Sequence, residues 1–358
     1  LDLIIAEQDK TGARLSEQEI ARLIASNNDE EKVGGFLYQA CELLRSGNPQ
    51  AALESLTSVR KAIGFTPLPV IANIIWLCKE LDTQQTAAYE CLSFAVDTCE
   101  MGYDNIALEA ASAALMLDTL GTFEIIRSPD MTLKTVLLYE KIAMRHFPAF
   151  KDKNIKTDNN DRPVNVAMVI PNIVDYIVAY TQCSLHFARY ADPSKFRLFI
   201  YSTENFSTRD KPLFPFGAET YITEQTGAAS IREFTKRNTP VYLAPRNVDF
   251  IDASHAVVKK MESDKIDIAL FQGGLASPID WLVARFSKAP VKAAIHIGSS
   301  MMTPGLDITF FDNPSNIERE NNHWLEEAGK RIHLPNGVDI ENLAAQTPVA
   351  RSKFGIPD

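Results

Sequence analysis

The hydrophobic periodicity of this chain changes once, near residues 150–163, and that change limits the possible folds more than any other feature. From about Leu15 to His146, apolar residues recur at three- and four-residue spacing, which is typical of amphipathic helices. The stretch "FKDKNIKTDNNDRP" that follows is polar and rich in Asn and Asp, as expected of a linker. After it, short apolar runs alternate with helical segments. The sequence therefore predicts two architectures in one chain.

The apolar runs after the linker have the length of strands, and helical periodicity fills most of the gaps between them. Near-continuous apolar strands that alternate with helices indicate a parallel sheet covered on both faces. The predicted fold class is therefore α/β: an all-helical, repeat-like domain followed by a Rossmann-like parallel sheet. We expect strands at 164–170, 196–202, 240–244, 266–271, 291–297, 307–312 and 331–334, and helices at 173–190, 228–236, 250–261, 278–287 and 316–328.

These changes of pattern suggest domain boundaries. We expect a helical domain at residues 1–149, a linker at 150–163 and the sheet domain at 164–345. Residues 346–358, which end in a turn-like "FGIPD", are expected to begin a bridge into a further domain.

Two pieces of the helical half share one plan. "ACELLRSGNPQAALESLTSVRKA" and "AVDTCEMGYDNIALEAASAALMLD" each contain a helix, a Gly turn and an Ala-rich helix, as stacked helical hairpins of solenoids do. The positions that match the tetratricopeptide pattern are Gly47, Ala52 and Leu56 in the first piece and Gly102, Tyr103, Ala107 and Ala111 in the second. The usual Trp, first Gly and final Pro of that repeat are mostly unmatched. An irregular helical domain without repeat ancestry is therefore an open alternative.

Charge and composition exclude several classes of function. The formal net charge is −10, so nonspecific binding to nucleic acid or anionic lipid is not expected. No apolar run approaches the roughly 20 residues that span a bilayer, and the start "LDLIIAEQDK" lacks the features of a secretory signal. The 5 cysteines are odd in number and have no CxxC spacing, which favours reduced thiols. We expect a cytoplasmic protein without a transmembrane segment.

A ligand site is expected at the carboxyl ends of the strands, where the strand order reverses. If the first three strands run outward on one side and the fourth lies on the other, the crevice lies between the loops after Ile170 and Phe271. The first loop, "PNIVDY", is expected to open a helix whose early turn carries Asn172 and Asp175.

The second loop, "QGGLASP", combines backbone freedom with a helix start. Gly273 and Gly274 allow close approach to a ligand, while Ser277 is a natural N-cap with Pro278 at the first helical position. The exposed amides of such a helix start suit an anionic or hydroxyl-rich ligand. An equally open interpretation is that the glycines form only a strand-to-helix turn and Ser277 only a cap. The sequence has neither GxGxxG after the first strand nor GxxxxGK[ST], so hydride transfer with a dinucleotide and P-loop phosphoryl transfer have no motif support.

The fifth predicted strand ends in "AAIHIGSSMMTPG". His296 lies near its carboxyl end and is followed by Gly298, Ser299 and Ser300 at the same edge of the sheet. A lone histidine in an apolar strand is usually a core residue, but at this edge it can act as a base or bind a sugar hydroxyl or phosphate. The other histidines have no metal-ligand spacing, so no metal site is expected.

Several of these segments together resemble a known family. "IDIALFQGG", "SPIDWLVARFSKAPVKAAIHIGSS", "LDITFFDNP" and "IHLPNGVDIENL" resemble the first, acceptor-side Rossmann domain of glycosyltransferases of the GT-B type. With helical repeats in front, the run "VARFSKAPVKAAIHIGSSMMTPGLDITFFD" is similar to the O-linked N-acetylglucosamine transferase group. "LPNGVD" followed by "FGIPD" resembles the bridge into the second, donor-binding Rossmann domain of the retaining GT-B group.

The resemblance implies transfer of a sugar from a nucleotide-sugar substrate to a protein or glycan acceptor, with no cofactor and no obligatory metal. The helical domain would help to bind the acceptor. By position, His296 matches a histidine of the retaining group, and Asp175 is a second catalytic candidate. The loop "PNIVDY" departs from the usual glycine-rich or His-bearing loop. The candidate substrate-binding residues are Asn172, Gln272, Gly273, Gly274, Ser277, Gly298, Ser299 and Ser300.

Two other interpretations stay open. In one, the helical hairpins bind a partner and a degenerate, non-catalytic Rossmann domain serves as a scaffold. In the other, the chain belongs to a nonhydrolysing sugar-nucleotide epimerase, which shares the two-domain layout but rarely has a helical domain in front.

Overall fold

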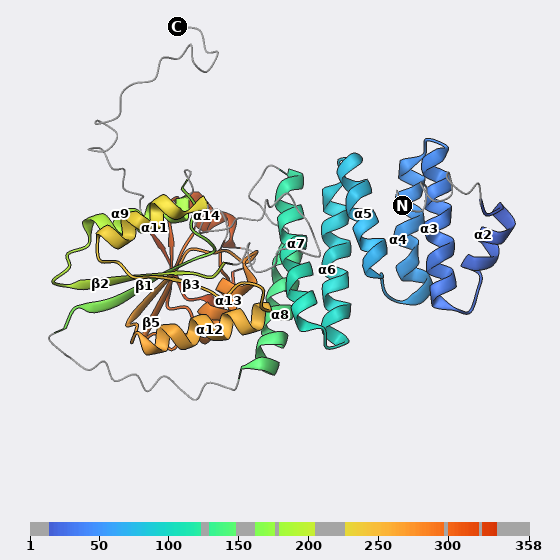
Figure 1. The fold of residues 1–358 in the computed structure, drawn as a ribbon. Helices are drawn as coiled ribbons and strands as arrows, with labels where there is room; N and C mark the ends of the chain where they lie inside the picture. Colours follow the sequence, from blue (N-terminus) through green and yellow to red (C-terminus); the bar gives the residue numbers. More distant parts are fainter. Residues whose placement is uncertain are drawn as a thin grey trace, which may run out of the picture.

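The chain forms a row of helices that ends against helices of an α/β part (Figure 1). None of the described helices is both long enough and apolar enough to cross a bilayer. The structure is a computed structural model, and it describes residues 14–122, 129–147, 162–175, 179–204, 226–296, 300–321 and 324–334.

The helical half is built from hairpins whose turns repeat one geometry. The two predicted Gly turns are confirmed: Gly47 and Gly102 have φ of +75° and +86°, a conformation that glycine adopts without strain. At each turn the glycine N–H bonds the carbonyl three residues before it, and the next N–H bonds a carbonyl five residues back, which closes the helix end. The helices are α2 (Glu17–Ile24), α3 (Asp29–Arg45), α4 (Pro49–Ile63), α5 (Leu68–Glu80), α6 (Gln84–Glu100), α7 (Asp104–Thr122) and α8 (Pro129–His146).

The second half is the predicted Rossmann-like sheet. Its seven described strands are all parallel and lie in the order β3-β2-β1-β4-β5-β6-β7. The strands are β1 (Val164–Ile170), β2 (Phe196–Ser202), β3 (Val241–Leu243), β4 (Ile268–Phe271), β5 (Val291–Ile295), β6 (Ile308–Phe311) and β7 (Lys330–His333). The helices between them are α9 (Ala179–Tyr190), α11 (Ala228–Lys236), α12 (Phe250–Ser263), α13 (Pro278–Phe286) and α14 (Pro314–Arg319), with the 3-10 turn η2 (Glu326–Ala328).

Two predicted helices differ from the structure. The helix expected from residue 173 does not include residues 173–175, which form an irregular segment, and α9 is described from Ala179. Val174 is fully buried there, and its N–H points to the hydroxyl of Thr181 at 3.4 Å instead of a helical carbonyl. The helix expected at 316–328 is replaced by α14 and η2. α14 starts earlier because the side chain of Asn313 caps it and a proline opens it.

Each face of the sheet has its own core. On one face, strand residues such as Met168 and Ile200 pack with Phe234 of α11. On the other, Val169 and Phe271 belong to a larger cluster that includes α12, α13 and the helical half. The alternation of neighbouring strand residues between the two clusters follows from the two-residue period of a strand.

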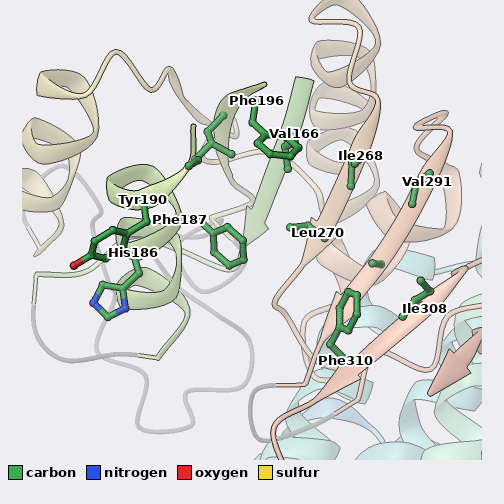
Figure 2. A pocket seen from close by; sticks show the side chains of 13 residues that line it. Val166, His186, Phe187, Tyr190, Phe196, Ile268, Leu270, Val291, Ile308 and Phe310 are labelled. Atoms are coloured by element: carbon green, nitrogen blue, oxygen red, sulfur yellow. The ribbon is translucent and has the colours of Figure 1, made fainter. Parts of the chain in front are cut away.

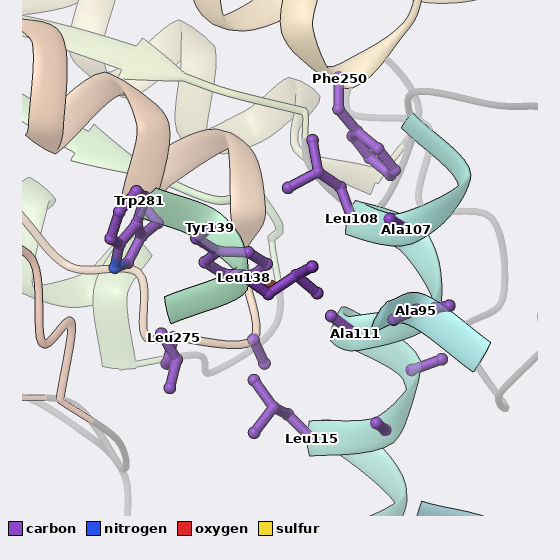
Figure 3. Packing of buried hydrophobic residues seen from close by; sticks show 14 of the residues in the cluster. Ala95, Ala107, Leu108, Ala111, Leu115, Leu138, Tyr139, Phe250, Leu275 and Trp281 are labelled. Atoms are coloured by element: carbon purple, nitrogen blue, oxygen red, sulfur yellow. The ribbon is translucent and has the colours of Figure 1, made fainter. Parts of the chain in front are cut away.

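The helical half is joined to the sheet through α7 and α8 (Figure 3). The ring of Tyr139 on α8 contacts that of Trp281 on α13 edge-on, with centroids 5.3 Å apart, and both side chains are fully buried. Nearby, Nε of Arg285 donates to Glu140 at 2.8 Å. One continuous apolar core therefore extends from the helices into the α/β part.

Candidate functional site

The strand order reverses between β1 and β4, which are neighbours in the middle of the sheet. β1 leads outward to β2 and β3, whereas β4 leads to β5, β6 and β7. This is the order on which the expected site depends. The loops after Ile170 and Phe271 therefore flank the edge at which sheets of this kind bind ligands.

Asn172 and Gln272 extend from β1 and β4, and the same helix holds both. The hydroxyl of Tyr180 donates to Oδ1 of Asn172 at 2.7 Å, and Nε2 of Gln272 donates to Oγ of Ser184 at 2.9 Å. Tyr180 and Ser184 lie one turn apart on α9, so they bring the two amides to one place. Both amides are buried, and Nδ2 of Asn172 and Oε1 of Gln272 have no hydrogen-bond partner in the described part of the chain. Each amide therefore has one end held and one end unpaired.

A buried carboxyl group lies beside this loop. Asp280 is in the first turn of α13, is fully buried, and accepts the hydroxyl of Thr203 on Oδ2 at 2.8 Å. Its Oδ1 has no hydrogen-bond partner among the described residues. Loss of water raises the pKa of Asp280 to about 7, and the hydrogen bonds from Thr203 and from its own backbone offset this only in part. Near neutral pH this carboxyl group can either give or take a proton.

The glycine pair allows the loop after β4 to lie on that carboxyl group. A Cβ at position 273 would be 2.6 Å from Cγ of Asp280, so Gly273 is needed for close approach. The carbonyl of Gly274 accepts the N–H of Ser277 at 2.9 Å, which shapes the turn. Ser277 is the N-cap residue with Pro278 in the first turn, as predicted, but its side chain makes no capping hydrogen bond.

Two contacts tie the same loop to its surroundings. The N–H of Leu275 donates to the carbonyl of Ser300 at 3.1 Å, which links the loop after β4 to the segment after β5. The carbonyl of Ala276 accepts the hydroxyl of Ser112 on α7 at 2.6 Å. The helical half thus bonds directly to a loop of the candidate site.

His296 directly follows β5 and is held on several sides. Its N–H donates to the carbonyl of Phe310 at 2.8 Å, and its ring stacks on Phe311 with centroids 4.9 Å apart. Nε2 lies 3.4 Å from Oε1 of Glu320, which is within ion-pair range but not aligned as a hydrogen bond. The hydroxyl of Ser300 donates to the other carboxylate oxygen of Glu320. Two predicted site residues therefore share one carboxylate.

Asp175 caps the N-terminus of α11. Its two carboxylate oxygens accept the N–H groups of Ser230 at 2.7 Å and Ala229 at 3.0 Å. Desolvation raises the pKa of Asp175, but these hydrogen bonds together outweigh it, so the pKa lies below its usual value. Both oxygens are occupied in holding α11, and a catalytic role for Asp175 stays a prediction.

The structure brings the two amides and the glycine pair together at the predicted edge, whereas Gly298 and Ser299 lie outside the described residues. The sequence analysis did not identify Asp280 or Glu320 as site residues. The sequence does mark Asp280, because it is a charged residue inside the otherwise apolar "PIDWLVA". No comparable signal marks Glu320 in the polar "NIERENN". Among the described side chains, no group of three or more His, Cys, Asp or Glu could hold a metal ion.

An apolar cavity of about 580 Å³ lies away from these polar groups, over the face of the sheet beside α9 (Figure 2). Strand residues such as Val166, Ile268 and Val291 line it together with Phe187 of α9. Val291 is 39% exposed, so the described residues leave part of this face open. The lining offers little polar chemistry, and the candidate site stays at the strand ends.

No protein-family model matches the chain, and no curated protein matches its sequence. Among solved structures, the chain is similar to a mutant of the O-GlcNAc transferase of Thermobaculum terrenum, with 13% sequence identity and a TM-score of 0.40. The similarity covers 86% of this chain and 58% of the transferase chain. With an identity and a TM-score this low, the function of that protein cannot be assigned to this chain.

Proposed function

We propose that this chain is the helical and acceptor-side part of a glycosyltransferase that moves a sugar from a nucleotide-sugar to a protein or glycan acceptor. The observation that carries the proposal is the set of buried, unpaired polar atoms at the strand ends where the sheet order reverses. These atoms are Nδ2 of Asn172, Oε1 of Gln272 and Oδ1 of Asp280.

Unpaired buried polar atoms are costly, and three of those in the described part of the chain lie at this edge. Each costs about 1–3 kcal/mol of stability, and proteins tolerate such violations mainly at functional sites. A sugar presents several hydroxyl groups that both donate and accept hydrogen bonds. Such a ligand could satisfy an amide N–H, an amide oxygen and a carboxyl oxygen at once, whereas an apolar ligand could satisfy none. The sequence resemblance of residues 164–358 to GT-B enzymes supports the same reaction.

Thermal unfolding with nucleotide-sugars tests the proposal. A ligand that binds only the folded protein raises its unfolding temperature by mass action. The protein should be expressed to its natural C-terminus, so that any donor-binding domain is present, and heated with UDP-, GDP- and ADP-sugars in EDTA. We expect one base class to raise the unfolding temperature without a metal. A folded protein that responds to none of the donors would contradict the proposal.

His296 is the residue for which we expect the largest effect on turnover. Replacing His296 with Ala should lower transfer by about 100-fold or more, as the loss of a general base does. His333→Ala is the matched control, because His333 is an exposed histidine at the end of β7. The measurement is sugar transfer to acceptor by both variants, with circular dichroism to check folding. Unchanged turnover in the His296 variant would remove it from the mechanism.

One observation favours an interaction scaffold as the second candidate. α8 exposes Leu133, Leu137 and Met144, which are 45%, 60% and 77% accessible and share one face of the helix. Exposed apolar stripes of this kind often mark protein interaction surfaces. This function predicts that no donor sugar raises the unfolding temperature, so the same experiment separates the two candidates.

A further inference from the structure

Glu320 joins two predicted site residues that the sequence did not connect to it. It follows α14 as the C-cap and is 7% exposed. One carboxylate oxygen accepts the hydroxyl of Ser300, and the other faces Nε2 of His296 at 3.4 Å. A buried carboxylate therefore bridges the end of β5 and the segment beyond it.

The imidazole of His296 has little freedom beside this carboxylate. Its side chain is 2% exposed, and its ring lies against that of Phe311 with an interplanar angle of 24°. The stacking fixes the ring plane, and the position of Glu320 decides which edge of the ring faces the carboxylate. Nε2 faces Glu320, so Nδ1 is the ring nitrogen that this carboxylate does not engage.

The contact between Glu320 and His296 is long, and this fits a group that acts during catalysis. At 3.4 Å the two atoms are within ion-pair range but not aligned for a hydrogen bond. Catalytic hydrogen bonds are often long without substrate and shorten in the reacting complex. The hydroxyl of Ser300 holds the other oxygen of Glu320, so the carboxylate cannot simply turn away.

We propose that Glu320 is a positioning residue: it keeps the proton of the neutral imidazole on Nε2, so that Nδ1 of His296 can accept a proton from the acceptor. This role rests on the proposed glycosyl transfer. In that reaction the acceptor O–H bond breaks and its proton moves to Nδ1. The acceptor oxygen bonds the anomeric carbon, while the bond from that carbon to the nucleoside diphosphate breaks and its electron pair leaves with the diphosphate. The imidazolium that forms is stabilised by the carboxylate of Glu320.

The position of the ring proton can be measured directly. Nitrogen chemical shifts of histidine rings distinguish a proton on Nε2 from one on Nδ1, and the protein has 6 histidines to label with ¹⁵N. His296→Gln identifies the signal. We expect His296 to carry its proton on Nε2 in the unmodified protein and to lose this preference in Glu320→Gln. Glu318→Gln is the matched control, since Glu318 is an exposed glutamate of the same helix, and it should leave the signal unchanged.

Kinetics then separate positioning from binding. In the protein taken to its natural C-terminus, Glu320→Gln should lower kcat about tenfold or more while KM for the nucleotide-sugar stays within about twofold, because the proposed role of Glu320 is to orient the ring of His296 and not to bind the donor. Glu320→Asp, which keeps the charge but shortens the reach, should recover part of kcat. Circular dichroism shows whether each variant is folded.

Each result bears on the proposal in a defined way. If Glu320→Gln leaves the His296 proton on Nε2, Glu320 does not position the ring and the inference is wrong. If the proton shifts but kcat is unchanged, the orientation has no catalytic role. If the unmodified protein transfers no sugar at all, the proposed function fails, and the nitrogen shifts still decide whether Glu320 sets the state of the ring.

Discussion

At the scale of single residues, Asp280 is the most consequential side chain of the candidate site. It is fully buried, accepts one side-chain hydrogen bond, and has its pKa raised to about 7 mainly by burial. A carboxyl group whose pKa is raised on folding favours the folded state in its protonated form. Its effect on stability is therefore absent at low pH and grows as the pH rises above its ordinary pKa of 3.8.

Asp280→Asn should make the protein less sensitive to pH. Between about pH 4 and pH 7 the unfolded chain ionises Asp280 freely and the folded chain does not, so the free energy of unfolding falls by an amount on the order of 4 kcal/mol. Asn cannot ionise, so the stability of the variant relative to the unmodified protein should increase as the pH rises. The measurement is urea unfolding of both proteins across this range.

A control separates this effect from general pH sensitivity. Asp252→Asn changes an exposed carboxylate in the first turn of the neighbouring helix α12, and it should follow the unmodified protein at every pH. A constant difference in stability between Asp280→Asn and the unmodified protein would show that Asp280 is already ionised in the folded chain.

Some residues of the candidate site could be predicted from the sequence and others could not. His296 and the pair Gly273-Gly274 could be placed at the strand ends because each directly follows an apolar run. The partnership of His296 with Glu320 depends on how the segment after β6 folds back, and no local pattern encodes that. The link between Asp280 and Thr203 likewise joins residues 77 apart in the chain.

At the scale of elements, the packing of α2 on α3 depends on one of two adjacent glycines. A Cβ on Gly35 would lie 2.8 Å from the backbone N of Ile24 and 2.9 Å from Cβ of Leu23. A Cβ on Gly34 would meet nothing within 4 Å. Both are inside a helix, so they differ only in what they face.

Alanine at these two positions should have opposite effects. Gly34→Ala should stabilise the protein by about 0.5–1 kcal/mol, because alanine loses less conformational freedom in a helix. Gly35→Ala should destabilise it by about 1–3 kcal/mol, because α2 must move away from α3. Chemical denaturation of the two variants measures both changes. Equal effects of the two substitutions would mean that α2 does not pack closely on α3.

The helices and strands also show where contacts between distant parts of the chain override the local sequence pattern. The apolar runs predicted the strands of the sheet well, because burial between two layers of helices leaves a clear signal in each strand. The helix expected from residue 173 was wrong at its start, because Asp175 caps α11, and Asp175 and Ser230 are 55 residues apart in the chain. A helical pattern in "PNIVDY" could not reveal that contact.

At the scale of the whole molecule, the helical half and the sheet share one core. Leu108 and Leu115 of α7 and Tyr139 of α8 lie in the same buried cluster as Leu275 and Trp281 of the sheet half (Figure 3). Two parts joined by such a core are expected to unfold together. The change of pattern at 150–163 gave no sign of this joint.

Tyr139→Ala should lower the stability of both halves at once. Removing a fully buried aromatic ring costs about 3–5 kcal/mol. Variants that keep Trp281 and only one of the other two tryptophans, Trp76 in the helical half or Trp324 in the sheet half, would allow the two parts to be compared. We expect both signals to shift together to lower urea concentration. Loss of the Trp76 transition alone would mean that the halves are independent domains.

The position of the joint also affects how such a molecule can diversify. α7 contacts α12 and α13, α8 contacts α13, and Ser112 of α7 bonds the loop after β4, while α2 lies at the far end of the row (Figure 1). Hairpins can therefore be inserted or deleted beyond α6 without disturbing the chemistry at the strand ends. Selection can then change the length of the row of helices while the candidate site at the strand ends stays the same.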